Sequence, residues 1–392
     1  MHGTDPGPLI EASPSGLRLP FVLMRGGTSK AVFLRGSDLP PDAGQRDATI
    51  LSLFGSPDTR QIDGLGGADL LTSKLAIIDP PTHPEADLDY TFGQVSITEP
   101  IVDYDINCGN ISAAVGAYAV DEGLVPSTDP TTVVRIHNTN TSRILKAHVP
   151  IVDGLAAVEG DYVVHGVPGS GAPIGLDFGR TAGGTTGSLL PTGNAVDELP
   201  TSFGHVAVSI VDLANLTVFF SAHAVGMQGT EGPQEITDEQ LKRVAAVKAA
   251  AAARLGIEGD GLIPVPAIVS EPEGYIAFGT DSPVEADDID LVARVVGGRP
   301  PVLHKAYPGT LAACTAVASL IPGTTVHDVV RQPVSGEISI GHTSGIMPAR
   351  AHVSRDRDGW SVDTAIYQRT ARRIAEGTAF VRTDRVGDEA RR

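Results

Sequence analysis

The sequence predicts an α+β fold made of two similar β-rich, barrel-like domains, each wrapped around one central helix. Three observations support this. The chain has 392 residues, which exceeds one ordinary hydrophobic core. It contains 45 glycines and 29 prolines, which suits short strands separated by tight turns. Finally, one wholly apolar helical segment occurs in each half.

The strands are expected where short β-rich runs are bounded by Gly, Pro, Asp or Asn. Clear examples are Ala31–Leu34, Leu75–Ile78, Val95–Ile97, Val133–Ile136 and Val206–Val211.

Three segments predict helices. Ile111–Glu122 and Leu311–Leu320 are small and apolar all round, so both should be buried. Their openings are alike, with CGNISAA starting at residue 108 and PGTLAAC at residue 308. In Thr237–Leu255, a capping box precedes a single apolar stripe, which indicates a supporting helix at the surface.

The two helical openings favour a duplicated architecture. The Gly- and Thr-rich stretch 183–193 is the expected crossover between the halves. We therefore expect an N-terminal domain at residues 1–187, with 1–16 a loose tail, and a C-terminal domain at residues 188–392.

The bulk composition restricts the class of partner. A formal charge of −18 repels nucleic acids and anionic membranes. Two cysteines cannot form a disulfide framework and suit a reducing compartment, and no apolar run is long enough to span a bilayer. A cytoplasmic protein is expected. With only six lysines, it must concentrate its cations locally to bind an anion.

The tripeptide Thr-Ser-Lys occurs twice beside glycine-rich turns, ending at Lys30 and at Lys74. Hydroxyls, an ammonium group and flexible backbone together suit a carboxylate. A desolvated lysine can also have its pKa lowered toward neutrality and act as a base. A solvated lysine at the start of a strand is the alternative for each.

Cys108 lies at the start of an apolar helix and is followed by Gly109 and Asn110. The free N–H groups of a helix N-terminus bind anions, and glycine lets a ligand approach the backbone closely. A small, inert cysteine in the core is the alternative. His304 and Lys305, just before the second apolar helix, could add positive charge to the same cleft.

Several chemistries lack their motifs. The sequence has no Walker loop, no G-x-G-x-x-G in a βαβ unit, no zinc-spaced His/Cys set and no G-x-S-x-G. Acid–base chemistry without a metal or cofactor is therefore favoured.

In order and spacing, the motifs resemble those of the PrpF-like isomerases. The motifs are MRGGTSK at 24–30, DGLGG at 63–67, TSK at 72–74, NCGN at 107–110, GSGAPI at 169–174, LPTG at 190–193 and GTE at 229–231. The likeness runs from about residue 21 to residue 381. Enzymes of this family isomerise 2-methylaconitate, 4-oxalomesaconate or 3-methylitaconate. At 342–345 this chain has HTSG where the family usually has HPSG.

The resemblance implies a diaminopimelate-epimerase-like fold with the active site between the two domains. It implies Lys74 as the base and Cys108 as the acid or orienting group. The expected substrate-binding residues are Arg25, Ser29, Lys30, Gly67, Ser73, Gly109, Asn110, Ser112, Lys305, His342 and Ser344. The implied partner is a small anionic carboxylate, and a homodimer is consistent with the family.

Two other functions stay open at this point. A racemase or epimerase acting at one stereocentre needs a second acid/base group, yet the second helix starts with Pro308-Gly309, and Cys314 falls well inside it. A non-catalytic carboxylate-binding protein is the third possibility. The sequence does not distinguish cis–trans isomerisation from an allylic shift.

Overall fold

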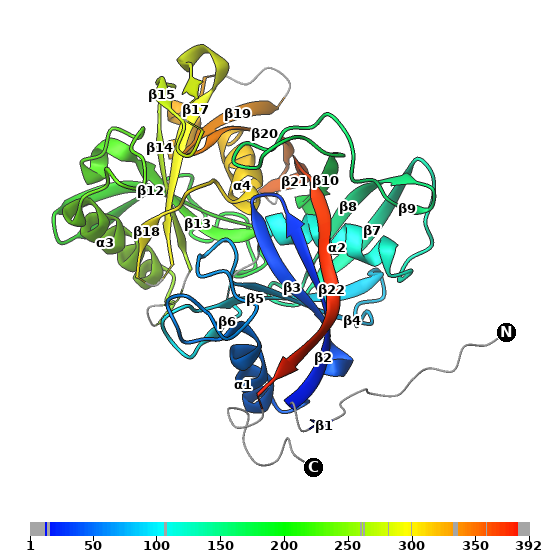
Figure 1. Cartoon of the computed structure of the whole chain (residues 1–392). Coiled ribbons are helices and arrows are strands. Elements are labelled where there is room, and N and C mark those ends of the chain that lie inside the picture. Colours follow the sequence, from blue (N-terminus) through cyan, green and yellow to red (C-terminus); the bar gives the residue numbers. More distant parts are fainter. Residues whose placement is uncertain are drawn as a thin grey trace.

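Two almost wholly apolar helices lie inside the two halves of the molecule (Figure 1). They are α2 (Gly109–Asp121) and α4 (Gly309–Ser319), and all their residues except Asp121 are buried. The structure is a computed structural model that describes residues 12–13, 16–105, 108–258, 261, 263–280, 282–298, 300–331, 336–357 and 359–382.

In the first half, strands surround α2 in a fixed order of pairing. The strands are β2 (Gly16–Gly26), β3 (Ser29–Arg35), β4 (Lys74–Asp79), β5 (Leu88–Val95), β7 (Thr131–Asn138), β8 (Arg143–Val152) and β10 (Ile174–Asp177). Successive pairs are antiparallel, parallel, antiparallel, parallel, antiparallel and antiparallel.

The second half repeats this pattern around α4. Its strands are β12 (Gly204–Leu213), β13 (Asn215–Ser221), β14 (Val265–Ser270), β17 (Leu291–Gly297), β19 (Glu337–His342), β20 (Gly345–Arg355) and β21 (Trp360–Arg369). The pairs again run antiparallel, parallel, antiparallel, parallel, antiparallel and antiparallel. The duplication predicted from two short helical openings is therefore confirmed over the strand topology.

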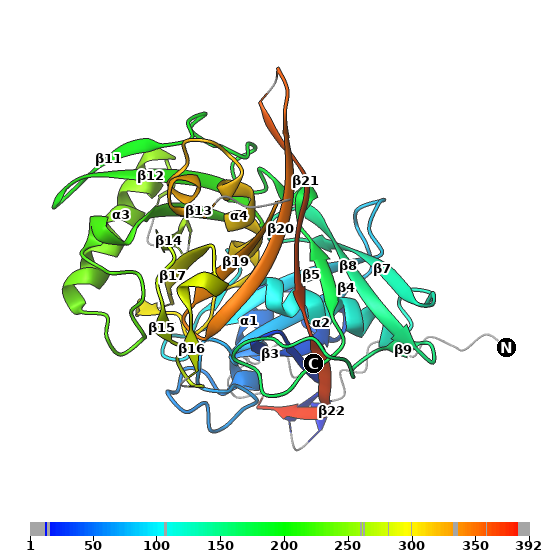
Figure 2. The ribbon, with the colours of Figure 1, turned by 90° about the horizontal axis from the view of Figure 1, so that it is seen from above.

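The two halves join edge to edge. β10 and β21 hold equivalent places in the two halves, and they pair antiparallel with each other, Ile174 lying opposite Arg369. After β21, the last strand β22 (Ala371–Val381) returns to the first half and pairs along the whole of β2. Figure 2 shows β20 and β21 as a long hairpin whose far end projects from the body. The predicted division at residue 187 stays a prediction.

Each half also has an amphipathic helix on the outer face of its strands. α1 (Ala43–Phe54) buries Ile50, Leu53 and Phe54 against one cluster of strand side chains. α3 (Asp238–Arg254) buries Val244 and Val247 against another. The capping box predicted at the start of α3 is present. The sequence pattern did not predict α1.

The remaining elements are short or peripheral. They are β1 (Ala12–Ser13), β6 (Val102–Asp103), β9 (Leu155–Ala156), β11 (Asp197–Thr201), β15 (Tyr275–Ile276), β16 (Pro283–Val284), β18 (Val302–Leu303) and α5 (Thr325–Val329). The strand predicted at Val95–Ile97 is wrong. β5 starts at Leu88 and ends at Val95, because Ser96 turns the chain by bonding to the carbonyl of Ile101.

Candidate active site

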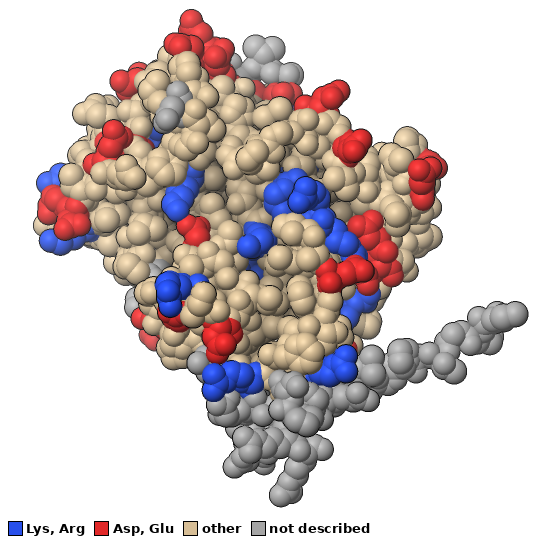
Figure 3. Space-filling view, in the orientation of Figure 1, with Lys and Arg blue, Asp and Glu red and all other residues tan. Residues whose placement is uncertain are grey.

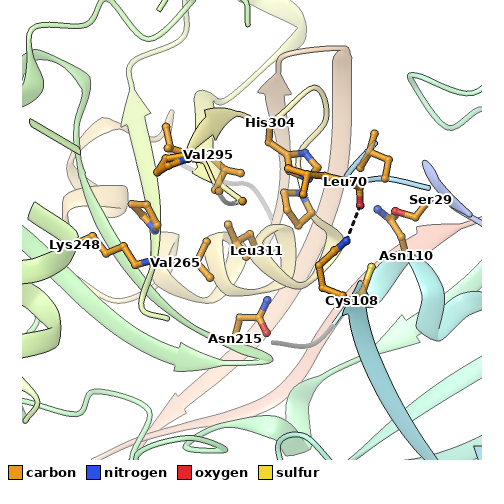
Figure 4. A pocket seen from close by; sticks show the side chains of 18 of the residues that line it. Ser29, Leu70, Cys108, Asn110, Asn215, Lys248, Val265, Val295, His304 and Leu311 are labelled. Carbon is orange, nitrogen blue, oxygen red and sulfur yellow. Dashed lines mark hydrogen bonds between the residues drawn. The ribbon is translucent and has the colours of Figure 1, made fainter. Parts of the chain in front are cut away.

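A pocket opens between the two halves, where the N-termini of α2 and α4 meet. Ser29, Lys74, Cys108 and Asn110 lie at one end, and apolar side chains of α3, β14 and β17 line the other. Figure 4 shows Ser29, Asn110 and Cys108 on one side of the pocket and Val265, Val295 and Lys248 on the other. In Figure 3, several Lys and Arg side chains lie near the centre of one face of the molecule, whereas acidic side chains lie mostly toward its edge.

Lys74 is the first residue of β4, and its side chain lies on the face of the strand that packs on α2. Its side chain is buried and Nζ lies 2.6 Å from Oε1 of Gln94 and over the ring of Phe92. The Gln94 amide is itself oriented, because its Nε2 donates to the carbonyls of Ser73 and Leu70. Lys74 is therefore fixed by an uncharged acceptor instead of a carboxylate.

This environment changes the acidity of the lysine. Burial lowers the pKa of Lys74 below its ordinary value, although the nearby Cys108 and Asp69 partly oppose the shift. Desolvation disfavours the ammonium form, and an amide oxygen compensates it only in part. A neutral amine that donates one N–H to Gln94 keeps a lone pair that can accept a proton.

Cys108 forms the N-cap of α2 and lies partly exposed at the pocket. The thiol and the Lys74 amine are close enough for their charges to interact. The first backbone N–H groups of a helix have no partner within that helix, and they carry the positive end of its dipole. The site thus brings a sulfur, an amine and anion-attracting amides to one place.

The N-terminus of α4 faces that of α2, and Tyr367 lies between them. A Cβ atom added at Gly109 would lie 1.8 Å from the Tyr367 hydroxyl, and one at Gly309 would lie 2.2 Å from its ring. Glycine is thus required at both helix starts because an aromatic ring fills the space that a Cβ atom would take, while Gly109 still lines the pocket. Pro308, not a second cysteine, lines the pocket at the start of α4.

Two polar groups at this end favour an anion. Ser29 Oγ is buried and has no hydrogen-bond partner in the described part of the structure. Asn110 donates through Nδ2 to Thr28 Oγ1 and accepts through Oδ1 from Arg369 Nε. An unpaired buried hydroxyl costs free energy, so a ligand oxygen that pairs with it is stabilised.

His304 and Lys305 do not supply the free positive charge expected of them. His304 lines the pocket, but burial and the nearby Lys74 lower its pKa to about 4, so it is neutral at neutral pH. Its Nδ1 lies 2.5 Å from the carbonyl oxygen of Ala306 and 3.3 Å from the backbone nitrogen of the same residue. Lys305 forms an ion pair with Asp69, with a distance of 2.6 Å.

Arg25 and Lys30 lie opposite each other on β2 and β3. Both side chains alternate with residues that face α2, so they lie on the other face of these strands. One nitrogen of Arg25 donates to the carbonyl of Gly27 and to both oxygens of Thr370. The structure therefore does not bring either residue into the described pocket.

The other predicted binding residues lie around the site and stabilise it through hydrogen bonds and packing. Ser73 Oγ bonds to the Val95 carbonyl and to Gln61, Ser112 Oγ donates to the Cys108 carbonyl, and Gly67 packs against Thr72.

His342 lines a second small cavity, and Ser344 lies close to it in the chain. His342 is buried and accepts at Nδ1 from the Ser344 backbone, and burial holds its pKa well below the usual range. The Ser344 hydroxyl bonds to the Lys305 carbonyl, which fixes the segment that leads into α4.

Gln94, Tyr367 and Arg369 are the polar groups that sequence reasoning missed. Each lies within a strand and carries no local motif, so only the pairing of distant strands reveals its place. Cys314 is a core residue as predicted, and burial raises its pKa to about 12.

Two features are absent from the described residues. They contain no group of His, Cys, Asp and Glu arranged to bind a metal ion. Within the same residues, no helix combines the length and the apolar character needed to cross a bilayer.

The fold of two duplicated halves is similar to that of an epimerase of known structure. The crystal structure of a hydroxyproline epimerase from Agrobacterium vitis matches 96% of the chain and 98% of its own, with a TM-score of 0.54 at 12% identity. This likeness shows the fold alone. The predicted fold class is confirmed.

The chain belongs to the PrpF family, whose sequence profile ("PrpF protein") matches residues 16–382. It is 50% identical to 3-methylitaconate isomerase of Eubacterium barkeri, over 93% of this chain and 97% of the relative. It is 36% identical to 2-methyl-aconitate isomerase of Shewanella oneidensis, over 94% and 98%. A crystal structure of methylitaconate Δ-isomerase covers 95% of the chain and 98% of its own, with 48% identity and a TM-score of 0.79. The protein is an isomerase.

Proposed function

We propose that the protein moves a proton, and with it a double bond, within a small unsaturated carboxylate of the methylitaconate type. Lys74 acts as the base and Cys108 as the acid or orienting group, and no metal or cofactor takes part. One observation carries the proposal. In the described part of the structure, a buried lysine that is hydrogen-bonded to an amide and not to a carboxylate lines the same pocket as a thiol at a helix N-terminus, and the two interact electrostatically.

The reaction begins with neutral Lys74. The amine takes a proton from the carbon between the alkene and a carboxylate, so a C–H bond breaks and an N–H bond forms. The electron pair shifts the double bond and spreads into an extended enolate. The amides at Gly109 and Asn110 stabilise the developing negative charge. The Cys108 thiol returns a proton to the far carbon, and transfer from the Lys74 ammonium to the thiolate restores both groups.

The apolar end of the pocket supports a diacid substrate that carries an alkyl group. Leu311, Val265 and Val295 line this end, and Lys248, the cation there, donates to the carbonyl of Gly261. A third carboxylate would lose its hydration against these apolar side chains, which costs much free energy. An alkyl substituent gains free energy there because it leaves water. A dicarboxylate such as methylitaconate is therefore favoured over a tricarboxylate.

A single-centre racemase is the second candidate, since the fold is shared with an epimerase. That reaction needs acid/base groups on both faces of one carbon. Pro308 occupies the position equivalent to Cys108, and Cys314 is buried within α4. Neutral His304 is the imidazole in the described lining of the pocket, so it is the group that a racemase would have to use.

Proton NMR in D₂O tests the proposal. The full-length protein is incubated with methylitaconate, 2-methylaconitate, 4-oxalomesaconate and proline in turn. Deuterium at the allylic carbon together with a shifted alkene supports the proposal. Deuterium at one stereocentre without a shifted alkene supports a racemase. Binding without exchange of any of the four compounds contradicts an enzymatic role and supports a carboxylate-binding protein.

A further inference from the structure

Arg369, the last residue of β21, is one of the largest fully buried side chains in the described part of the protein. Its guanidinium donates from Nε to Oδ1 of Asn110 at 2.7 Å, from Nη1 to the carbonyl of Gln368 and from Nη2 to Sδ of Met347. It also lies 4.8 Å from the centre of the Tyr367 ring. The cation therefore lies directly behind the start of α2.

The charge of this guanidinium is uncompensated. Among the residues that the structure describes, its partners are an amide, a carbonyl and a thioether, and no Asp or Glu forms an ion pair with it. The ionisable groups that interact with its charge include Tyr367, Tyr162, Cys108 and His342. A buried charge is costly unless it is paired, so an unpaired one calls for a reason beyond stability.

The Arg-Gly-Gly turn at 25–27 is shaped around this contact. A Cβ atom at Gly27 would lie 2.2 Å from Oδ1 of Asn110 and 2.7 Å from Cδ of Arg369. A Cβ atom at Gly26 would lie 2.2 Å from the Asn110 carbonyl oxygen. Both glycines thus keep Asn110 and Arg369 in contact. Because Arg369 holds Oδ1, the Nδ2 group of Asn110 is directed toward Thr28 and the Ser29 side of the pocket.

We propose that Arg369 is a positioning residue that makes the pocket beside Cys108 selective for anions. It fixes the Asn110 amide with its donor side toward the site and supplies the positive charge that the strongly acidic protein lacks there. In the reaction this charge favours binding of the substrate carboxylate. The inference rests on the proposed function only in naming that carboxylate as the anion.

Alkylation of Cys108 measures the charge without any substrate. Iodoacetate is an anion and iodoacetamide is neutral, so the ratio of their rates reports the local potential. Cys314 is fully buried and does not compete in the folded protein. One unit charge acting over roughly 10 Å at an effective dielectric constant of about 20 changes a rate about tenfold. Arg369→Met should lower the ratio by about that factor, whereas Arg369→Lys should keep it.

The matched control is Arg294→Met. Arg294 is equally buried and is bonded to the carbonyls of Glu231 and Thr230, outside the pocket lining. This variant should leave the ratio unchanged. If Arg369→Met does not fold, Arg369→Gln removes the charge and keeps a polar group, with the same lowered ratio expected. An unchanged ratio in the folded Met or Gln variant, or an equal loss in Arg369→Lys, overturns the proposal.

A kinetic measurement separates this proposal from the proposed function. With methylitaconate, Arg369→Met should raise KM about tenfold with a smaller effect on kcat, because the ground-state carboxylate is bound less well. If the protein isomerises none of the carboxylates, the proposed function fails, and the alkylation ratio still tests Arg369. If isomerisation proceeds and neither KM nor the ratio changes, the inference about Arg369 fails alone.

Discussion

Replacing Lys74 by methionine separates catalysis from folding at one position. Methionine has a similar length and no charge. Loss of a general base lowers the rate by about 10²- to 10⁴-fold. Removing the desolvated amine gains some folding free energy, and leaving Gln94 Oε1 unpaired costs about 1–3 kcal/mol. The net change should lie within about 3 kcal/mol in either direction, so the fold survives.

The difference in stability between the wild type and the Met variant should change with pH in a direction that follows from the protonation of Lys74. Since burial lowers the folded-state pKa of Lys74, the unfolded chain binds more protons between that pKa and the ordinary lysine value. The stability of the wild type relative to the Met variant therefore rises with pH across this window. The relative stability of the Met variant is greatest below the folded-state pKa. Thermal unfolding at several pH values measures the difference.

The assay of activity is deuterium incorporation into methylitaconate, followed by proton NMR. Lys242→Met is the control, because Lys242 is an exposed lysine on α3. An exchange rate in Lys74→Met equal to that of the control would refute the role of this lysine. A stability difference that does not vary with pH would refute the assignment of a lowered pKa.

Four further predictions follow from the site. Cys108→Ser should lower kcat at least tenfold yet retain measurable exchange by NMR, because a hydroxyl can still orient the ligand. The kcat/KM of the wild type should rise with pH on a limb governed by Lys74 that lies below the ordinary lysine pKa, since the neutral amine is the base; a flat profile contradicts this. Gly109→Ala should lose about 1–3 kcal/mol in urea unfolding, because its Cβ meets the Tyr367 hydroxyl, whereas Gly44→Ala at the surface of α1 should not. Dialysis against EDTA should leave activity unchanged, and a loss restored by a divalent metal would contradict metal-free chemistry.

The sequence predicted those parts of the fold that depend on local patterns. The starts of α2 and α4 could be recognised because a helix that is apolar all round has no other place than a core. The duplicated topology followed from their likeness. α1 was missed because its apolar residues, Ile50, Leu53 and Phe54, are concentrated at its C-terminal end and give no long periodic stripe. The strand at Val95–Ile97 was predicted wrongly because the alternation of apolar and polar residues continues past the end of β5 into a turn.

The candidate site was predictable only where glycine-rich motifs mark it. Lys74, Cys108 and Asn110 meet at the pocket, and their catalytic and binding roles stay predictions. Arg25 and Lys30 share a motif with Ser29, but alternation along the strands turns them to the other face. Arg369 could not be found, because it reaches Asn110 only through the pairing of β21 with β10. The homodimer also stays a prediction.

The return of β22 to β2 has a consequence for dividing the chain. A fragment that ends near residue 187 would carry α2 and its surrounding strands, but β10 would lose its partner β21 and β2 would lose its partner β22. The open edge of β2 would expose its backbone N–H and C=O groups. Such an open edge recruits other chains and leads to aggregation. Fusing residues 371–381 ahead of residue 16 through a short linker would cover that edge. The permuted half should therefore aggregate less than the simple truncation.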